Sequence, residues 1–156
     1  MSKADQSEFV YVTFIRTTPE KLWSALTDPT QMKEYWFGMQ FQTEWRKGAQ
    51  WQMIFPDGRV ADTGEILELD RPKRIQLRWR NEFKPELKAE GFALCTIELE
   101  RYGDAVRLSI AHSIERADSK FIQAVSGGWP KILSNLKSLL ETGQVALTEA
   151  DRSHAR

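Results

Sequence analysis

The sequence predicts an α+β fold, in which a curved antiparallel sheet wraps around one long helix near the C-terminus. The first observation is a run of apolar residues at steps of three and four between Ile122 and Leu140, which is the spacing of one helix face. The second is the alternation of apolar and polar residues in several short segments before it, which is typical of antiparallel strands joined by hairpin turns. A sheet that is apolar on one face needs a cover, and this helix is the only one long enough to supply it.

The N-terminal part predicts one strand followed by two short helices. Phe9–Arg16 is rich in β-branched and aromatic residues and is expected to form the first strand. Thr18 is suited to cap a helix that begins at Pro19 and runs to about residue 26. Thr27-Asp28-Pro29 breaks this helix, and a second short helix is expected over Pro29–Tyr35.

Six further strands are expected between residues 39 and 112, which gives a sheet of about seven strands. Pro56-Asp57-Gly58 and Tyr102-Gly103-Asp104 are typical of tight turns, and Gly64 predicts a bulge or sharp bend within a long strand. The charged segment 81–90 contains Pro85 and is expected to be a loop. The expected strands are 39–45, 50–55, Val60–Asp70, 74–80, Phe92–Glu100 and Val106–His112.

The long helix has an expected beginning and end. Asp118 or Ser119 can cap its first turn, and Gly143 can close its last turn in a left-handed conformation. Gly127-Gly128 and Pro130 interrupt the helical pattern, and two interpretations remain open. Either the helix is kinked and stands off the sheet, leaving a void, or Pro130 opens the main helix after a shorter one. Both place the mouth of any pocket in the N-terminal third of the helix.

Length and composition predict one domain, expected at residues 9–143, with flexible tails at 1–8 and 144–156. Lysine plus arginine and aspartate plus glutamate both number 22, so the net charge of zero argues against nucleic acid as a principal partner. No apolar segment is long enough to insert into a membrane, and the polar N-terminus has no signal-peptide core. We therefore expect a cytoplasmic protein, which also fits the single cysteine, Cys95.

No motif for a metal, a cofactor or a catalytic group stands out in the sequence. His112 and His154 are far apart and have no cysteine partners, so no metal site is expected. The sequence has no glycine-rich phosphate loop, no serine–histidine–aspartate order and no paired cysteine spacing. We expect no cofactor and assign no catalytic residue, which favours a binding protein over an enzyme.

The sequence contains six tryptophans, a high number for 156 residues. They can build an aromatic core, or they can line a pocket, since ligand sites are mostly apolar with a few polar groups. His112 has the inward parity of the last strand, where it is either a structural histidine or a ligand contact. The residues expected to contact a ligand are Trp36, Trp51, Phe55, Trp79, His112, Val125, Trp129 and Leu133.

Four stretches taken together resemble a known family. They are Glu34–Gly38, Thr43–Ala49, Gly64–Pro72 and Gly127–Gly143. In their order and spacing, the chain from residue 9 to residue 143 is similar to bacterial proteins related to the C-terminal domain of the activator of Hsp90 ATPase. These proteins belong to the START/Bet v 1-like, or SRPBCC, superfamily. The resemblance implies a helix-grip fold with a hydrophobic cavity between the sheet and the long helix, and it leaves the activity open.

Three functions follow as hypotheses. The first is a binding protein that holds a small hydrophobic or aromatic ligand between sheet and helix. The second is an enzyme similar to polyketide cyclases or hydratases, in which His112 would act as acid or base. The third is a co-chaperone-like interaction module in contact with Hsp90, which predicts an exposed apolar patch on the folded domain. The sequence is compatible with a monomer and with a homodimer.

Overall fold

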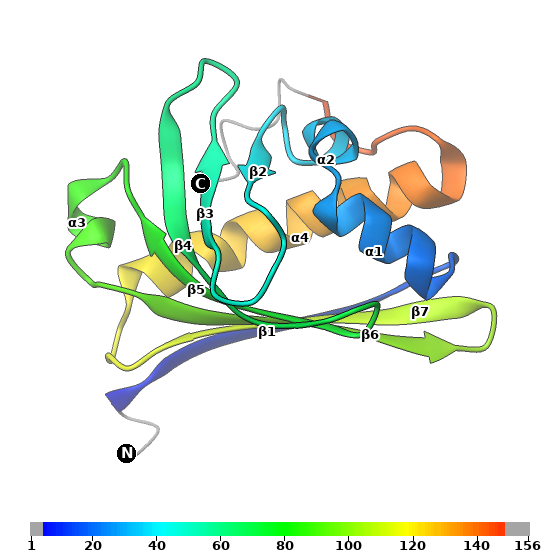
Figure 1. Ribbon diagram of the computed structural model, residues 1–156. Helices are drawn as coiled ribbons and strands as arrows, with labels where there is room; N and C mark the ends of the chain where they lie inside the picture. Colours follow the sequence, from blue (N-terminus) through cyan, green and yellow to red (C-terminus); the bar gives the residue numbers. More distant parts are fainter. Residues whose placement is uncertain (1–4, 149–156) are drawn as a thin grey trace.

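The computed structural model describes residues 5–148, which form one seven-stranded antiparallel sheet and four helices (Figure 1). The strands lie in the order β1-β7-β6-β5-β4-β3-β2, so the first strand pairs with the last. The strands are β1 (Ser7–Ile15), β2 (Gln40–Gln42), β3 (Gln50–Ile54), β4 (Val60–Asp70), β5 (Arg74–Asn81), β6 (Ala93–Tyr102) and β7 (Ala105–Ile114). The helices are α1 (Pro19–Thr27), α2 (Pro29–Tyr35), α3 (Pro85–Lys88) and α4 (Lys120–Thr142).

The sheet curves around α4, and α1 and α2 lie beside the same helix (Figure 1). From β2 to β7 each strand pairs with the next one along the chain, which requires only short connections between antiparallel neighbours. β1 and β2 form the two edges of the sheet, so α1 and α2 carry the chain from one edge to the other. The α+β class, the curved antiparallel sheet, the two helices after the first strand and the long final helix are confirmed.

An apolar layer covers the concave face of the sheet, because alternate residues of a strand point to the same face. Every second residue of β7 from Val106 to Ile114 is buried, and Cys95, Ile97 and Leu99 form the matching row on β6. These are the inward positions that the sequence predicted. α4 closes the layer with its own buried face, which includes Phe121, Ile122, Trp129, Ile132, Leu133 and Leu136.

The structure differs from the predicted elements in two places. β2 spans only Gln40–Gln42, and Trp45, which the predicted strand included, has a left-handed φ of 48° that a strand does not allow. The expected loop at 81–90 contains the short helix α3, and its first residue, Asn81, belongs to β5. The Asn81 side-chain oxygen accepts hydrogen bonds from the backbone N–H groups of Phe83 and Lys84, which turns the chain from β5 into α3.

The two ends of the described chain are attached to the fold. β1 begins at Ser7, so it includes two residues of the expected N-terminal tail. Near the other end, Leu147 and the Asn135 side chain of α4 exchange two hydrogen bonds, with the Leu147 N–H donating to Oδ1 at 2.6 Å and Nδ2 donating to the Leu147 carbonyl at 3.2 Å. The rest of the expected tails, residues 1–4 and 149–156, lies outside the described residues.

Gly64 lies between Trp51 of β3 and Trp79 of β5 in the register of the sheet. Of the bulge or sharp bend predicted at Gly64, the bulge is wrong: the register shifts at Ala61 and Leu67 instead, three residues to either side. A side chain at Gly64 would collide with the backbone carbonyl oxygen of Arg78 and with the Trp51 indole nitrogen. Its absence lets the Trp51 indole cross β4 and donate a hydrogen bond to that carbonyl at 3.1 Å.

We expect Gly64→Ala to lower the free energy of unfolding by about 3 kcal/mol, at the upper end of overpacking penalties, because the collision involves backbone atoms that cannot move aside. Urea unfolding followed by circular dichroism measures this. The matched control is Gly127→Ala on α4, where a Cβ meets open space and the better helix propensity should leave stability unchanged or raised by up to about 1 kcal/mol. Equal stability of the two variants would contradict the role given to Gly64.

Candidate functional site

α4 is held at its N-terminus by a side chain from another element. Ser119 caps the helix by accepting a hydrogen bond from the Ile122 N–H at 3.0 Å. The Glu90 carboxylate, which follows α3, accepts hydrogen bonds from the Ser119 hydroxyl and from the backbone N–H of Lys120 at 2.9 Å. The first turn of α4 contains no acidic residue, so Glu90 supplies the negative charge that the helix dipole favours there.

The C-terminal part of α4 is held against the edge strand β1. Gly143 ends the helix with a left-handed φ of 86°, as predicted. Lys137 donates a hydrogen bond to the Phe14 carbonyl and forms an ion pair with Glu141 at 2.8 Å. Glu141 also accepts a hydrogen bond from the Arg16 N–H at 2.8 Å. This backbone bond, followed by that from Lys137, lowers the pKa of the Glu141 carboxyl below its ordinary value.

Between these two attachments, α4 runs without a break through Gly127, Gly128 and Pro130. The interpretation in which Pro130 opens the main helix is wrong, because the helix begins ten residues earlier at Lys120. Proline removes one backbone donor from the helix, and glycine removes side-chain bulk. Of the two glycines, only Gly128 is buried, so it is Gly128 that leaves room between this turn of α4 and the sheet.

Three tryptophan rings meet under this part of α4. Trp36 follows α2, Trp79 lies on β5 and Trp129 lies on α4, and all three are buried. The Trp36 and Trp79 rings are nearly parallel, with an interplanar angle of 21° and centroids 6.4 Å apart. Trp129 meets both rings edge-on at 5.2 and 5.9 Å, and Phe41 meets both edge-on at 5.7 and 5.8 Å. We name the space that these four rings border the aromatic slot.

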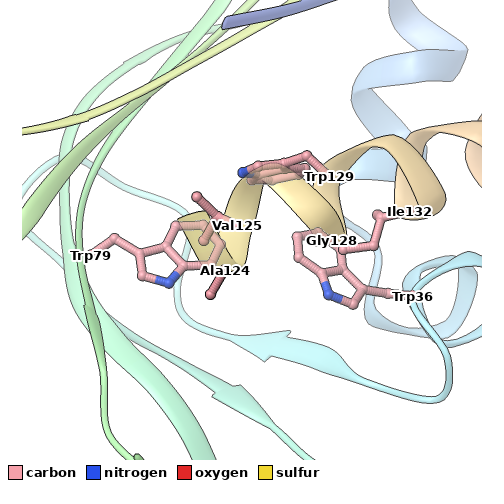
Figure 2. Close-up of a pocket in the computed structure, with 7 residues that line it drawn as sticks. All are labelled: Trp36, Trp79, Ala124, Val125, Gly128, Trp129 and Ile132. Carbon is pink, nitrogen blue, oxygen red and sulfur yellow. The ribbon is translucent and has the colours of Figure 1, made fainter. Parts of the chain in front are cut away.

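A small cavity adjoins this slot (Figure 2). Its volume of about 20 Å³ has room for one water molecule. Ala124 and Val125 are only half-buried, so the cavity lies close to the surface at the N-terminal half of α4. The lining residues are Trp36, Trp79, Ala124, Val125, Gly128, Trp129 and Ile132.

Four of the six tryptophan N–H groups fall into two kinds. Those of Trp51 and Trp129 are used inside the protein, the first on the Arg78 carbonyl and the second on His112 Nδ1, both at 3.1 Å. Those of Trp36 and Trp79 are buried and have no hydrogen-bond partner within the described part of the chain. Both of these side chains line the cavity, and Figure 2 shows their nitrogens on the same side of the two rings.

His112 lies behind the cavity wall. It is fully buried, its ring contacts those of Trp79 and Phe121 at 5.2 Å, and its Nδ1 accepts the hydrogen bond from Trp129. A nitrogen that accepts a hydrogen bond carries no proton, so this contact requires the neutral imidazole. His112 therefore orients the Trp129 ring that borders the slot.

The structure brings together half of the residues predicted to contact a ligand. Trp36, Trp79, Val125 and Trp129 line the cavity. The other four lie elsewhere: Trp51 packs on Trp79 at 4.8 Å, Phe55 packs on Phe83 near the β3–β4 turn, and Leu133 and His112 are buried behind the lining. Ligand contact remains a prediction for all eight.

Sequence reasoning missed three lining residues, all on α4. They are Ala124, Gly128 and Ile132. Ile132 belongs to the predicted apolar helix face, so helical spacing from Trp129 could have found it. Ala124 and Gly128 are four residues apart on that face, and both are small. Small residues at this spacing indicate where a cavity can form, not which side chains contact a ligand.

The described residues contain no group of metal-binding side chains, and none of their helices is long and apolar enough to cross a membrane. Cys95 is buried, which raises the pKa of its thiol, so it packs as a small apolar residue and is not poised as a nucleophile. The cavity lining itself contains no carboxylate, imidazole, hydroxyl or amine group. Its polar groups are indole N–H donors.

Comparison with protein families matches residues 16–141 to the family of activator of Hsp90 ATPase homolog 1-like proteins. A search among curated proteins gives no match. Among solved structures, a Mesorhizobium loti protein has a TM-score of 0.76 at 23% identity over 89% of this chain and 100% of its own. A Cytophaga hutchinsonii protein has a TM-score of 0.69 at 26% identity, over 88% of this chain and 95% of its own. An Hsp90 activator of Plasmodium falciparum has a TM-score of 0.69 at 18% identity, over 85% of this chain and 95% of its own.

The attachment of α4 to β1 predicts a pH-dependent stability. Because the folded-state pKa of Glu141 is lowered, its contribution is present above the ordinary glutamate pKa of about 4.3 and is lost as the pH falls through the folded value. We expect wild type to be more stable than Glu141→Gln at pH 7, and we expect this difference to shrink between about pH 5 and pH 3. Urea unfolding at several pH values measures it, with Glu86→Gln on the exposed surface of α3 as control. A difference that grows toward pH 3 would contradict the assignment.

Proposed function

We propose that this chain, which belongs to the family of activator of Hsp90 ATPase homolog 1-like proteins, binds a small planar aromatic molecule between Trp36 and Trp79. The observation that carries the proposal is the near-parallel arrangement of these two rings at 6.4 Å. Carbon atoms in contact are about 3.5 Å apart, so a flat ring between two others needs a separation of about 7 Å. The 6.4 Å between the two ring centroids is therefore too short for a ring sandwiched between them by about 0.6 Å or more, so the two rings must first move apart.

Trp36 is placed to open the slot. It caps α2, outside the regular helix, and is followed by Phe37 and Gly38 with left-handed φ values of 53° and 83°. Trp79, in contrast, lies within β5, between two paired strands. Entry of a ligand thus requires movement of the Trp36 side chain at the α2–β2 turn, while the sheet stays fixed. The ligand gains ring contacts on both faces in exchange, each worth about 1 kcal/mol beyond area burial.

The test uses toluene as a probe and the tryptophan indole N–H signals in ¹H–¹⁵N NMR spectra as the readout. We expect toluene to shift the signals of Trp36, Trp79 and Trp129, assigned with single Trp→Phe variants. Gly128→Leu places a side chain in the cavity and should weaken toluene binding at least tenfold. Gly127→Leu adds the same side chain at the next position, where a Cβ meets open space, and should change binding less than twofold. Absence of any toluene-induced shift at Trp36 and Trp79 would refute the proposal.

A second candidate function is contact with Hsp90 through the convex face of the sheet. Val10, Val12 and Phe14 alternate along the edge strand β1 and are 56%, 38% and 43% exposed, and the Phe14 ring contacts that of the exposed Tyr102 at 5.1 Å. A cluster of exposed apolar side chains is the feature expected of an interaction surface. The family description and the Plasmodium falciparum relative, an Hsp90 activator, make this chaperone the partner to test.

For this second candidate, we expect purified Hsp90 to hydrolyse ATP faster when this chain is added. Val12→Lys places a charge in the middle of the exposed apolar row and should reduce the stimulation at least fivefold, corresponding to about 1 kcal/mol of binding free energy. Gln50→Lys, at an exposed position of β3 near the opposite edge of the sheet, should retain the stimulation. An ATPase rate that does not respond to the wild-type chain would rule out this function.

The proposed setting is a reducing cytoplasm. The support is the single cysteine of the sequence, Cys95, which is buried as a free thiol and has no cysteine to pair with.

A further inference from the structure

The two edges of the sheet differ in how well they are protected against pairing with another strand. β2 has only three residues, and a short edge strand offers few backbone groups for pairing. β1, at the other edge, has nine residues that pair with β7 without a shift of register. Its sequence contains no proline and no lysine. β1 therefore lacks the bulge, the proline and the lysine with which proteins commonly protect an exposed edge.

Two hydrogen bonds to α4 show which backbone groups point away from β7. The N–H of Arg16, which follows β1, donates to a side chain of α4, and the Phe14 carbonyl accepts from another. Every second residue of an antiparallel strand directs its N–H and its carbonyl to the same side. The backbone groups of Glu8, Val10 and Val12 therefore also point out of the sheet edge.

This outward edge is open over residues 8–12. The side chains of α4 occupy it only from Phe14 onward. The N-terminal end of β1 runs away from α4 (Figure 1), and an open groove separates residues 6–9 from residues 117–126. Val10, in the middle of the open stretch, is 56% exposed. A strand from outside can therefore reach these backbone groups.

A second copy of this chain fits the open stretch, because the stretch is its own complement. In an antiparallel pair of identical strands, a twofold axis brings each outward N–H to a carbonyl of the same stretch. The charges follow the same symmetry. Glu8 lies at the N-terminal end, and Arg16 and Arg107, the partner of Phe14 on β7, lie at the other end. Within the described chain, none of these three side chains forms an ion pair. Antiparallel pairing brings the acidic end of each copy toward the basic end of the other.

We propose that this chain forms a homodimer in which the β1 strands of two copies pair antiparallel about a twofold axis at Val10. Val10 then lies opposite Val10 of the second copy, and Glu8 lies opposite Val12. The three residues of each copy exchange about six backbone hydrogen bonds across the axis. The two sheets become continuous, and the exposed Val10 side chains cover one another. The aromatic slot takes no part in this contact, since no residue of β1 lines its cavity.

The test is analytical ultracentrifugation of the purified chain without any chaperone, because the contact with Hsp90 considered above uses the same strand. We expect a dimer with a micromolar dissociation constant, as for a small interface. Val10→Lys and Val10→Glu each place two like charges opposite one another, so each should weaken the dimer at least tenfold. A mixture of the two variants should dimerise again, because opposite charges then face each other. This recovery requires residue 10 of one copy to face residue 10 of the other.

Two further measurements separate edge pairing from other effects. Leu94→Lys adds the same charge at a 38% exposed position of β6, two strands away from the edge, and should change the dissociation constant less than twofold. In the wild-type chain, hydrogen exchange of the Val10 and Val12 backbone amides should slow as the protein concentration rises. This readout needs no variant, so it decides the question even if a variant does not fold.

The outcomes are distinct. A wild-type chain that stays monomeric up to millimolar concentration overturns the inference. A dimer that Leu94→Lys weakens and Val10→Lys does not would place the contact on the face of the sheet and overturn it as well. A mixture of the two Val10 variants that stays monomeric overturns the pairing about Val10. None of these results bears on the aromatic slot, which is tested separately with toluene.

Discussion

The contact between α4 and the tryptophan layer of the sheet is the constraint on which the rest of the structure depends. The sheet buries its concave face only if α4 lies along it, and α4 is attached at both ends by charged side chains. Glu90 holds the N-terminus, while Lys137 and Glu141 hold the other end to β1. The buried face of α4 holds the helix on the sheet together with these attachments, so the structure tolerates a cavity of about 20 Å³ under its middle.

The large aromatic side chains of that layer explain why it is imperfectly packed. Large flat rings meet mostly edge-on, and such arrangements leave gaps that aliphatic side chains would fill. Gly64 allows the Trp51 and Trp79 rings to meet across β4, and Gly128 keeps α4 from filling the space above them. The result is a slot with two unused donors, an arrangement that an optimally stable core would avoid.

The two faces of the sheet carry features of different kinds. The concave face is closed by α4 and offers a water-sized cavity, whereas the convex face exposes Val10, Val12 and Phe14 on the edge strand. These features do not share residues, because the cavity is lined by Trp36, Trp79 and residues of α4, and by no residue of β1. The proposed ligand and the proposed protein partner would therefore contact different residues of this protein. Coupling between them would require the sheet itself to change.

Features that depend on neighbouring residues could be predicted from the sequence alone. The caps at Thr18, Ser119 and Gly143, the inward rows of β6 and β7 and the apolar face of α4 follow from local spacing and side-chain chemistry, and the structure has them as predicted. Trp79, Val125 and Trp129 line the cavity for the same reason, since strand parity or a helix face points them inward, whereas Trp36, the fourth predicted residue in the lining, follows α2.

Other features depend on how distant parts of the chain pack together, and the sequence did not predict them. Three features depend on residues that are far apart in the chain. They are the Glu90 carboxylate at the start of α4, the position of Gly64 between two indoles, and the difference between used and unused tryptophan donors. Phe55 and Leu133 have the right residue type and inward parity, yet other side chains stand between them and the cavity. Periodicity gives the direction of a side chain, whereas distance and hydrogen-bond partners are set by how the elements pack.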